Sequence, residues 1–73
     1  MTVFSGVARY AHERPDIEEM ARARNSARLQ ALERLRDYEL LAGGTFIERS
    51  ASDCIIYGPG GLLHVYRITA ELL

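Results

Sequence analysis

The residues of this chain best suited to chemistry are one cysteine, Cys54, and two histidines, His12 and His64. A cysteine nucleophile needs its base within hydrogen-bond reach. If Tyr57 pairs with Leu62 across the glycine-rich turn, Cys54 and His64 fall on opposite faces of a hairpin and cannot act together. These residues are too few for a Cys/His zinc site, and one cysteine forms no disulfide within the chain. We therefore expect no catalytic residue, no metal and no cofactor, and Cys54 as a small buried hydrophobe.

The run Gly58-Pro59-Gly60-Gly61 has the composition of a phosphate-binding loop. Such a loop continues into Lys-Ser/Thr at a helix start, and neither follows here. We interpret the run as a hairpin turn. No acids are paired in a recognisable catalytic context, so the sequence predicts a protein that is not an enzyme.

Charged residues are numerous but balanced, with ten acids, nine bases and a net charge of −1. This balance does not indicate a nucleic-acid coat or a membrane-surface protein. All the bases are arginine, which codon bias explains, although guanidinium groups also pair well with carboxylates and phosphates. Residues 1–36 are net +2 and residues 37–73 net −3, so the halves could complement each other within one chain or across a dimer.

The N-terminus lacks a basic region followed by an apolar run, so it does not look like a signal peptide. No apolar run approaches the length that spans a bilayer. We therefore expect a soluble protein of the cytoplasm, the host cytoplasm if a phage encodes it, with no membrane partner.

A long helix must position much of this charge. Asp16 and Glu19 form a capping box, Gly43-Gly44 supplies the end signal, and residues 16–41 between them contain no proline or glycine. At ~1.5 Å per residue the helix is roughly 39 Å long. A compact domain of 73 residues is only ~29 Å across. We therefore expect the helix to bend, to protrude or to meet a second chain, and 24–26 is its weakest stretch.

One face of this helix is apolar at ~100° per residue. Its members are Ile17, Met20, Ala21, Ala27, Ala31, Leu32, Leu35 and Tyr38. Arg24 and Arg28 interrupt this stripe, and two interpretations stay open. Either both lay their stems over the core and send their charges into water, or the helix leaves the body near residue 24. In the second case the arginines pair with acids such as Glu48 or Asp53, or with carboxylates of a partner.

After the helix the pattern changes to short runs rich in Ile, Val, Tyr and Phe. The predicted strands are residues 45–49, 53–57 and 62–68, with a turn at 50–52. An earlier strand fits residues 2–10, with Gly6 at a bulge. The predicted fold is one α+β domain over residues 1–73. One long helix packs on a three- to four-stranded, mostly antiparallel sheet in the order β-α-β-β-β.

The hairpin register makes both sheet faces apolar, and the helix can cover only one. One face carries Cys54, Ile56, Leu63, Val65 and Arg67; the other carries Ile55, Tyr57, Leu62, His64, Tyr66 and Ile68. A solvent-facing side of an antiparallel sheet normally alternates with polar residues. We expect the face of Tyr57, His64 and Tyr66 to lie away from the helix. Either the N-terminal segment or Leu72-Leu73 covers it, or it is a protein interface anchored by its aromatic residues.

These features predict a small non-enzymatic protein-binding module. In size and general character, and by no motif, the chain resembles accessory proteins of bacteriophages and mobile elements, such as anti-CRISPR proteins. The analogy implies an inhibitor that occupies the surface of a host nucleic-acid-processing complex. Its acids would compete with nucleic acid for basic grooves: Glu33, Asp37, Glu39, Glu48 and Asp53.

The alternative is a small dimeric DNA-binding regulator or antitoxin, whose arginines would contact phosphates: Arg22, Arg24, Arg28 and Arg36. The near-neutral charge makes nucleic acid the less favoured partner, and a homodimer stays open. The residues predicted to contact a partner are Arg24, Arg28, Glu33, Asp37, Glu48, Asp53, Tyr57, His64 and Tyr66.

Overall fold

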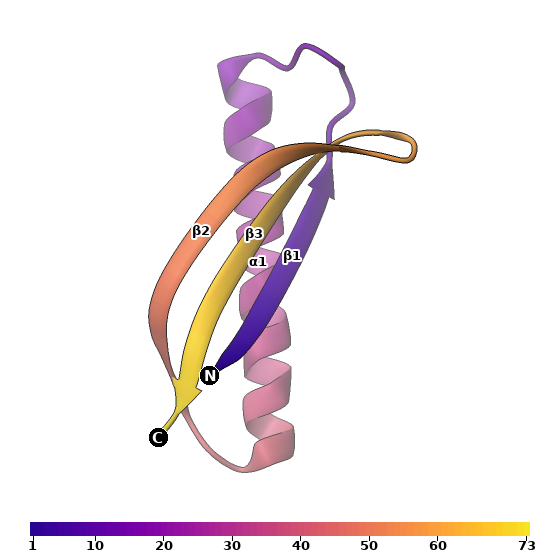
Figure 1. Cartoon of the computed structure of the whole chain (residues 1–73). Helices are drawn as coiled ribbons and strands as arrows, with labels where there is room; N and C mark the ends of the chain where they lie inside the picture. Colours follow the sequence, from indigo (N-terminus) through magenta and orange to yellow (C-terminus); the bar gives the residue numbers. More distant parts are fainter.

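The structure, a computed structural model, describes residues 1–73 and contains one helix and three strands. In chain order these are β1 (Thr2–Arg9), α1 (Ile17–Ala42), β2 (Phe46–Gly58) and β3 (Gly61–Leu72). The strands form one antiparallel sheet in the order β1-β3-β2, and α1 packs on one of its faces (Figure 1). The predicted α+β fold is confirmed, with the order β-α-β-β in place of β-α-β-β-β.

α1 begins and ends where its sequence signals predict. The Asp16 side chain accepts a hydrogen bond from the Glu19 N–H at 2.8 Å. Gly43 adopts a left-handed φ of 66°, and its N–H donates to the Glu39 carbonyl. The second half of the predicted capping box is absent, because the Glu19 carboxylate contacts His12 Nδ1 at 2.9 Å instead.

The helix does not leave the body near residue 24, which was one of the two open interpretations of the interrupted stripe. The molecule measures 41 × 20 × 16 Å, so it is an elongated slab and not the sphere on which the expectation from the helix length rested. β2 and β3 are 13 and 12 residues long, and the sheet therefore runs beside most of the helix, whose first turns extend beyond the end of the sheet (Figure 1). The stretch 24–26 stays helical, because Ala23 and Ala27 on either side of it are buried against the sheet.

β2 is one continuous strand where two strands were expected. The predicted turn at 50–52 is wrong, because Ser50 pairs with Thr69 and the following residues stay in register with β3. The irregularity lies between Glu48 and Ser50, where the register shifts as at a β-bulge. The predicted hairpin register is confirmed at Tyr57–Leu62, Ile56–Leu63, Ile55–His64 and Cys54–Val65.

A ridge of small side chains lets α1 approach β1 closely. Ala23, Ala27 and Ala31 are spaced four residues apart and are buried. A Cβ on Gly6 would lie 1.8 Å from the Ala27 carbonyl oxygen and 2.8 Å from the Ala31 nitrogen. Gly6 is therefore required by this close approach, and the prediction of a bulge there is wrong.

The predicted apolar stripe is right at its centre and wrong at its start. Ala27, Ala31 and Leu35 are buried as expected, but Ile17 and Ala21 are exposed. Ala23 is buried in their place, because the close contact with the strands needs small side chains at every fourth position and not large apolar ones.

α1 covers the sheet face that carries His64, Tyr66 and Ile68, and all three are buried. The expectation that this face lies away from the helix is therefore wrong. Since Gly6 and Phe4 lie on the same face and are buried with it, the close helix contact fixes this side as the covered one. The uncovered face is the one that carries Cys54 and Val65.

Candidate interaction surface

A polar network joins the four segments of the fold beneath the helix. The Tyr10 hydroxyl lies 2.7 Å from His64 Nδ1, and His64 Nε2 lies 2.6 Å from Asp53 Oδ2. Because an ionised carboxylate only accepts, His64 donates from Nε2 to Asp53, and in the neutral ring Nδ1 then accepts from the Tyr10 hydroxyl. Arg24 donates from Nε to the same Asp53 oxygen at 3.2 Å, and its guanidinium lies 5.4 Å from the centroid of the Tyr66 ring.

The network stabilises an ionised Asp53 and a protonated Tyr10. The hydrogen bond from His64 lowers the pKa of Asp53, and the charge of Arg24 acts in the same direction. Burial raises the pKa of the Tyr10 hydroxyl, and the negative charges of Glu19 and Asp53 add to this effect. A tyrosine that retains its proton is a poor base. Tyr10, Arg24, Asp53 and His64 line neither hollow of the surface, and their contacts link the segments of the fold to one another.

Arg24 combines parts of both interpretations of the interrupted stripe. It pairs with Asp53, as the second interpretation expected, yet the helix stays on the body. Arg28 donates from Nη2 to Asn25 Oδ1 on its own helix at 3.0 Å. Glu48 makes no ion pair. The Arg24–Asp53 contact is thus a link between α1 and β2 within the chain.

The remaining residues predicted to contact a partner lie on separate elements. Glu33 and Asp37 are exposed on α1, and Glu48 is exposed on β2. Tyr57 is 77% exposed near the hairpin. Since His64 and Tyr66 are buried, Tyr57 alone of the three aromatic-face residues is accessible to a partner.

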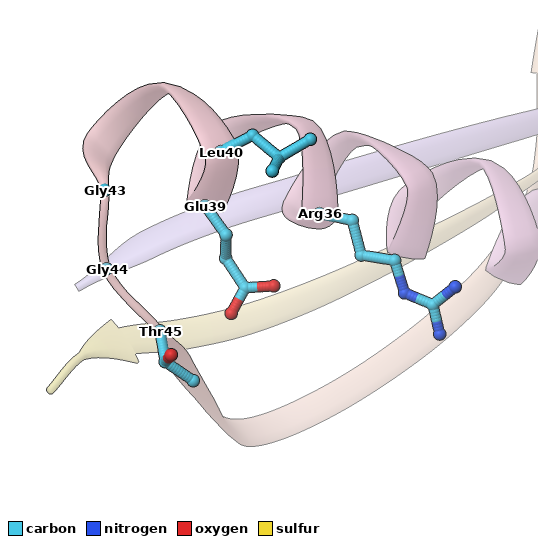
Figure 2. Close-up of a pocket in the computed structure, with 6 residues that line it drawn as sticks. All are labelled: Arg36, Glu39, Leu40, Gly43, Gly44 and Thr45. Carbon is cyan, nitrogen blue, oxygen red and sulfur yellow. The ribbon is translucent and has the colours of Figure 1, made fainter.

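The larger hollow of the surface, ≈ 690 Å³, lies at the C-terminal end of α1 (Figure 2). Its lining residues are Arg36, Glu39, Leu40, Gly43, Gly44 and Thr45. The Glu39 carboxylate already accepts the Phe46 N–H at 2.8 Å. The partial negative charge of a helix C-terminus also disfavours phosphate. Of the four arginines in the DNA-binding hypothesis, only Arg36 lines this hollow, and Arg22 lies near Glu18 at 3.8 Å. These arginines therefore form no shared surface around the hollow.

An apolar patch occupies the hairpin half of the uncovered sheet face. Its members are Val7, Cys54, Ile56, Leu63 and Val65, which lie in two adjacent cross-strand rows. Val65 is buried between Val7 and Cys54 on the neighbouring strands, whereas Val7, Cys54 and Ile56 are exposed. The expectation of a buried Cys54 is therefore wrong. Along the rest of this face polar residues such as Ser52, Arg67 and Thr69 are interspersed with Val3 and Ile47.

At the β1 edge, side chains of α1 bind the outward backbone groups. Gln30 Oε1 accepts the Val7 N–H at 2.7 Å, and Arg34 donates to the Ser5 carbonyl at 2.7 Å. Unpaired strand edges invite pairing with another chain, and covering them prevents it. The middle of the β1 edge is covered in this way.

The β2 edge is bound by α1 only at Phe46, whose N–H donates to Glu39, and has no such cover from Ala51 to Tyr57. Along an antiparallel strand, the backbone N–H and C=O groups of successive residues point alternately to the two sides. The Val7 N–H points out of the sheet, so Val65, which faces Val7, directs its backbone groups to β2 and not to β1. The next residue, Tyr66, directs its backbone groups to β1. The residues of β2 opposite the even-numbered β3 residues then point their N–H and C=O groups away from the sheet. These residues are Phe46, Glu48, Ala51, Asp53, Ile55 and Tyr57, and β2 has no second neighbouring strand to pair with them.

Sequence reasoning missed Tyr10, Gln30 and Arg34. The alternation of Phe4, Gly6 and Ala8 continues to Tyr10 and could have placed it on the covered face. The two edge-covering side chains are four residues apart and flank the alanine ridge, but nothing local shows that a strand edge lies beside them. The patch residues of the hairpin were grouped correctly on one face, which was then assigned to the helix, but Val7 on β1 was not placed with them.

Three further findings bear on the class of protein. α1 does not combine the length and the apolar character needed to cross a bilayer. No three His, Cys, Asp or Glu side chains gather where they could hold a metal ion. Comparison with known protein families, curated proteins and solved structures finds no match to this chain.

Proposed function

We propose that this chain is a non-enzymatic protein-binding module that docks on its partner through the apolar patch. The patch itself is the observation that carries the proposal. A solvent-facing side of an antiparallel sheet is normally polar at alternate positions. Here adjacent strands present apolar side chains in two neighbouring rows, and contiguous apolar surface of this kind marks sites of protein contact.

The charges beside the patch favour a partner whose apolar surface is flanked by carboxylates. Arg67 follows Val65 by two residues on the same face and makes no hydrogen bond or ion pair within the chain. Arg49 and Glu71 neutralise each other at 3.0 Å further along. A partner carboxylate placed near the patch can therefore form a charge-assisted hydrogen bond with Arg67.

The identity of the partner as a host nucleic-acid-processing complex stays a prediction. Glu33 and Asp37 lie on α1, on the opposite side of the sheet from the patch. A partner bound at the patch would leave these acids exposed. The regulator hypothesis has less support, because Arg24 pairs with Asp53 and Arg28 donates to Asn25 within the chain.

A capture experiment with matched variants tests the proposal. Wild-type protein, Val7→Glu and Leu29→Glu are immobilised and exposed to lysate of the native host, and captured proteins are identified. Val7 and Leu29 are similarly exposed, at 42% and 52%, but only Val7 belongs to the patch. Circular dichroism verifies that all three are folded.

We expect a protein that wild type and Leu29→Glu retain and that Val7→Glu loses. With that protein purified, Val7→Glu should weaken binding by about a hundredfold, the effect of placing a charge in a desolvated contact. Equal capture by all three, or capture of nothing, contradicts the proposal.

A further inference from the structure

We propose that two copies of this chain pair antiparallel along their β2 edges and form one continuous six-stranded sheet. The outward N–H and C=O groups from Ala51 to Tyr57 have no partner within the chain, and main-chain pairing with a second strand would satisfy them. A strand that pairs antiparallel with its own copy generates the two-fold symmetry of the commonest homodimers.

β2 lacks the usual features that protect an edge. Between Ala51 and Tyr57 it contains no proline and no lysine, and its bulge lies outside this stretch, at Glu48/Ser50. Its one charge, Asp53, is already neutralised by Arg24 and hydrogen-bonded to His64. A second β2 strand therefore meets no uncompensated charge.

The alternation of backbone groups restricts the register of this pairing. Outward residues must face outward residues, so Asp53 can face Ala51, itself, Ile55 or Tyr57. Facing itself opposes two carboxylates, and facing Ala51 or Ile55 places a carboxylate against an aliphatic side chain. Facing Tyr57 places the carboxylate opposite a side chain that carries a hydroxyl, and it centres the pair on Ile55, which then faces its own copy, while Cys54 faces Ile56. This register matches apolar side chains at Cys54, Ile55 and Ile56, and it is the one we assign.

This register also joins the two apolar patches. Cys54 and Ile56 belong to the patch. In the assigned pairing, Cys54 of one copy lies beside Ile56 of the second copy. The two patches therefore become one surface that crosses the two-fold axis on the uncovered face. On the helix-covered side, Ile55 and the 77% exposed Tyr57 gain neighbours.

The size of the chain favours this assembly. Only 13 of 73 residues are buried, and small domains without disulfides or metals are commonly stabilised by oligomerisation. The pairing does not depend on the proposed function. A protein that stays monomeric overturns the pairing and leaves partner binding at the patch intact.

Two charge variants test the edge. The mass in solution of wild type, Ile55→Lys and Val3→Lys is measured by light scattering over a range of concentrations. Both residues are exposed aliphatic side chains of edge strands, but Val3 lies on β1. We expect wild type and Val3→Lys to be dimers and Ile55→Lys to dissociate about a hundredfold more readily, because two lysines then face each other. A wild-type monomer at ~0.1 mM, or equal dissociation of both variants, overturns the proposal.

Disulfide trapping tests the register without relying on stability. In a Cys54→Ser background, Ile55→Cys places two thiols opposite each other, within the ~5.5 Å Cα spacing that a disulfide accepts. Val3→Cys in the same background is the control, with one exposed thiol on the other edge. Oxidation should give a covalent dimer rapidly with Ile55→Cys and at least ~10 times more slowly with Val3→Cys. Equal rates overturn the assigned register.

Discussion

β1 and β2 are both edge strands of the same sheet, but only β1 is in close contact with α1. The helix approaches β1 until its backbone nearly touches Gly6, and Gln30 and Arg34 bind the outward backbone groups of the strand. β2 meets α1 at few places, and its residues are exposed along most of its length. The helix therefore covers the middle of the β1 edge and leaves the β2 edge open from Ala51 to Tyr57.

The difference shows that two kinds of interaction hold the sheet together. Apolar packing against α1 holds β1 and β3, which supply most of the core around Phe4 and Ile68. β2 is held by its ladder to β3 and by the Asp53 contacts with His64 and Arg24. Substitutions that disrupt the packing on α1 and substitutions that disrupt the Asp53 contacts should therefore affect the two edge strands unequally.

The largest effect is expected at Gly6. Gly6→Ala places a methyl group 1.8 Å from the Ala27 carbonyl, and the backbone of α1 must move to admit it. We expect a loss of about 3 kcal/mol or more in the free energy of unfolding, measured in urea. Gly58→Ala on β2 is the matched control, because its methyl group meets only the flexible end of Leu63, and it should cost less than about 1 kcal/mol. Similar losses at both positions contradict the close approach of α1 to β1.

This contrast also explains how far the sequence could predict the fold. The ends of α1 and the hairpin register depend on local signals, Asp16, Gly43 and the turn at 58–61, and all were predicted correctly. The bulge near Ser50 was mistaken for a turn, because small polar residues are common in both.

The choice of the covered face could not be predicted, because both faces of the hairpin are apolar. That choice depends on the fit of Gly6 against Ala27 and Ala31, which are more than twenty residues away in the chain. The patch was missed for the same reason. The expectation that the helix must bend, protrude or meet a second chain assumed a spherical body, whereas the long strands make a slab about as long as the helix.

The next largest effect is expected at Asp53. Asp53→Ala removes the acceptor of His64 and the partner of Arg24, and a buried donor left without a partner costs about 1–3 kcal/mol. Glu71→Ala, which breaks the exposed pair with Arg49, should cost about 0.5 kcal/mol or less. Urea unfolding measures both. Equal costs would show that the network does not hold β2.

The stability of the protein should depend on pH through the same network. Because the pKa of Asp53 is lowered on folding, its contribution is present above the unfolded pKa and is lost as the pH falls below about 4. Thermal unfolding followed from pH 7 to 2 should show this decline, and Asp53→Asn should flatten it. Because the pKa of Tyr10 is raised, a second decline should begin as the pH rises above about 10, and Tyr10→Phe should reduce it. Unchanged profiles in both variants contradict these assignments.

The smallest effect on stability is expected at the cover of the β1 edge. Gln30→Ala with Arg34→Ala should lower the free energy of unfolding by only about 1 kcal/mol, because both hydrogen bonds are exposed to water. The double variant should, however, form species larger than those of wild type, since β1 then also presents a free edge. Glu33→Ala with Arg36→Ala is the control, and light scattering is the measurement. Unchanged mass in the double variant shows that these side chains do not protect β1.

Amide hydrogen exchange, measured residue by residue, tests the central claim most directly. In monomeric Ile55→Lys, the Val7 amide should be protected by Gln30, while the outward amides of Asp53 and Tyr57 exchange freely. In wild type at high concentration, all three should be protected. Free exchange of Val7 in either protein, or of Asp53 in concentrated wild type, would contradict the account of one covered edge and one edge that pairs.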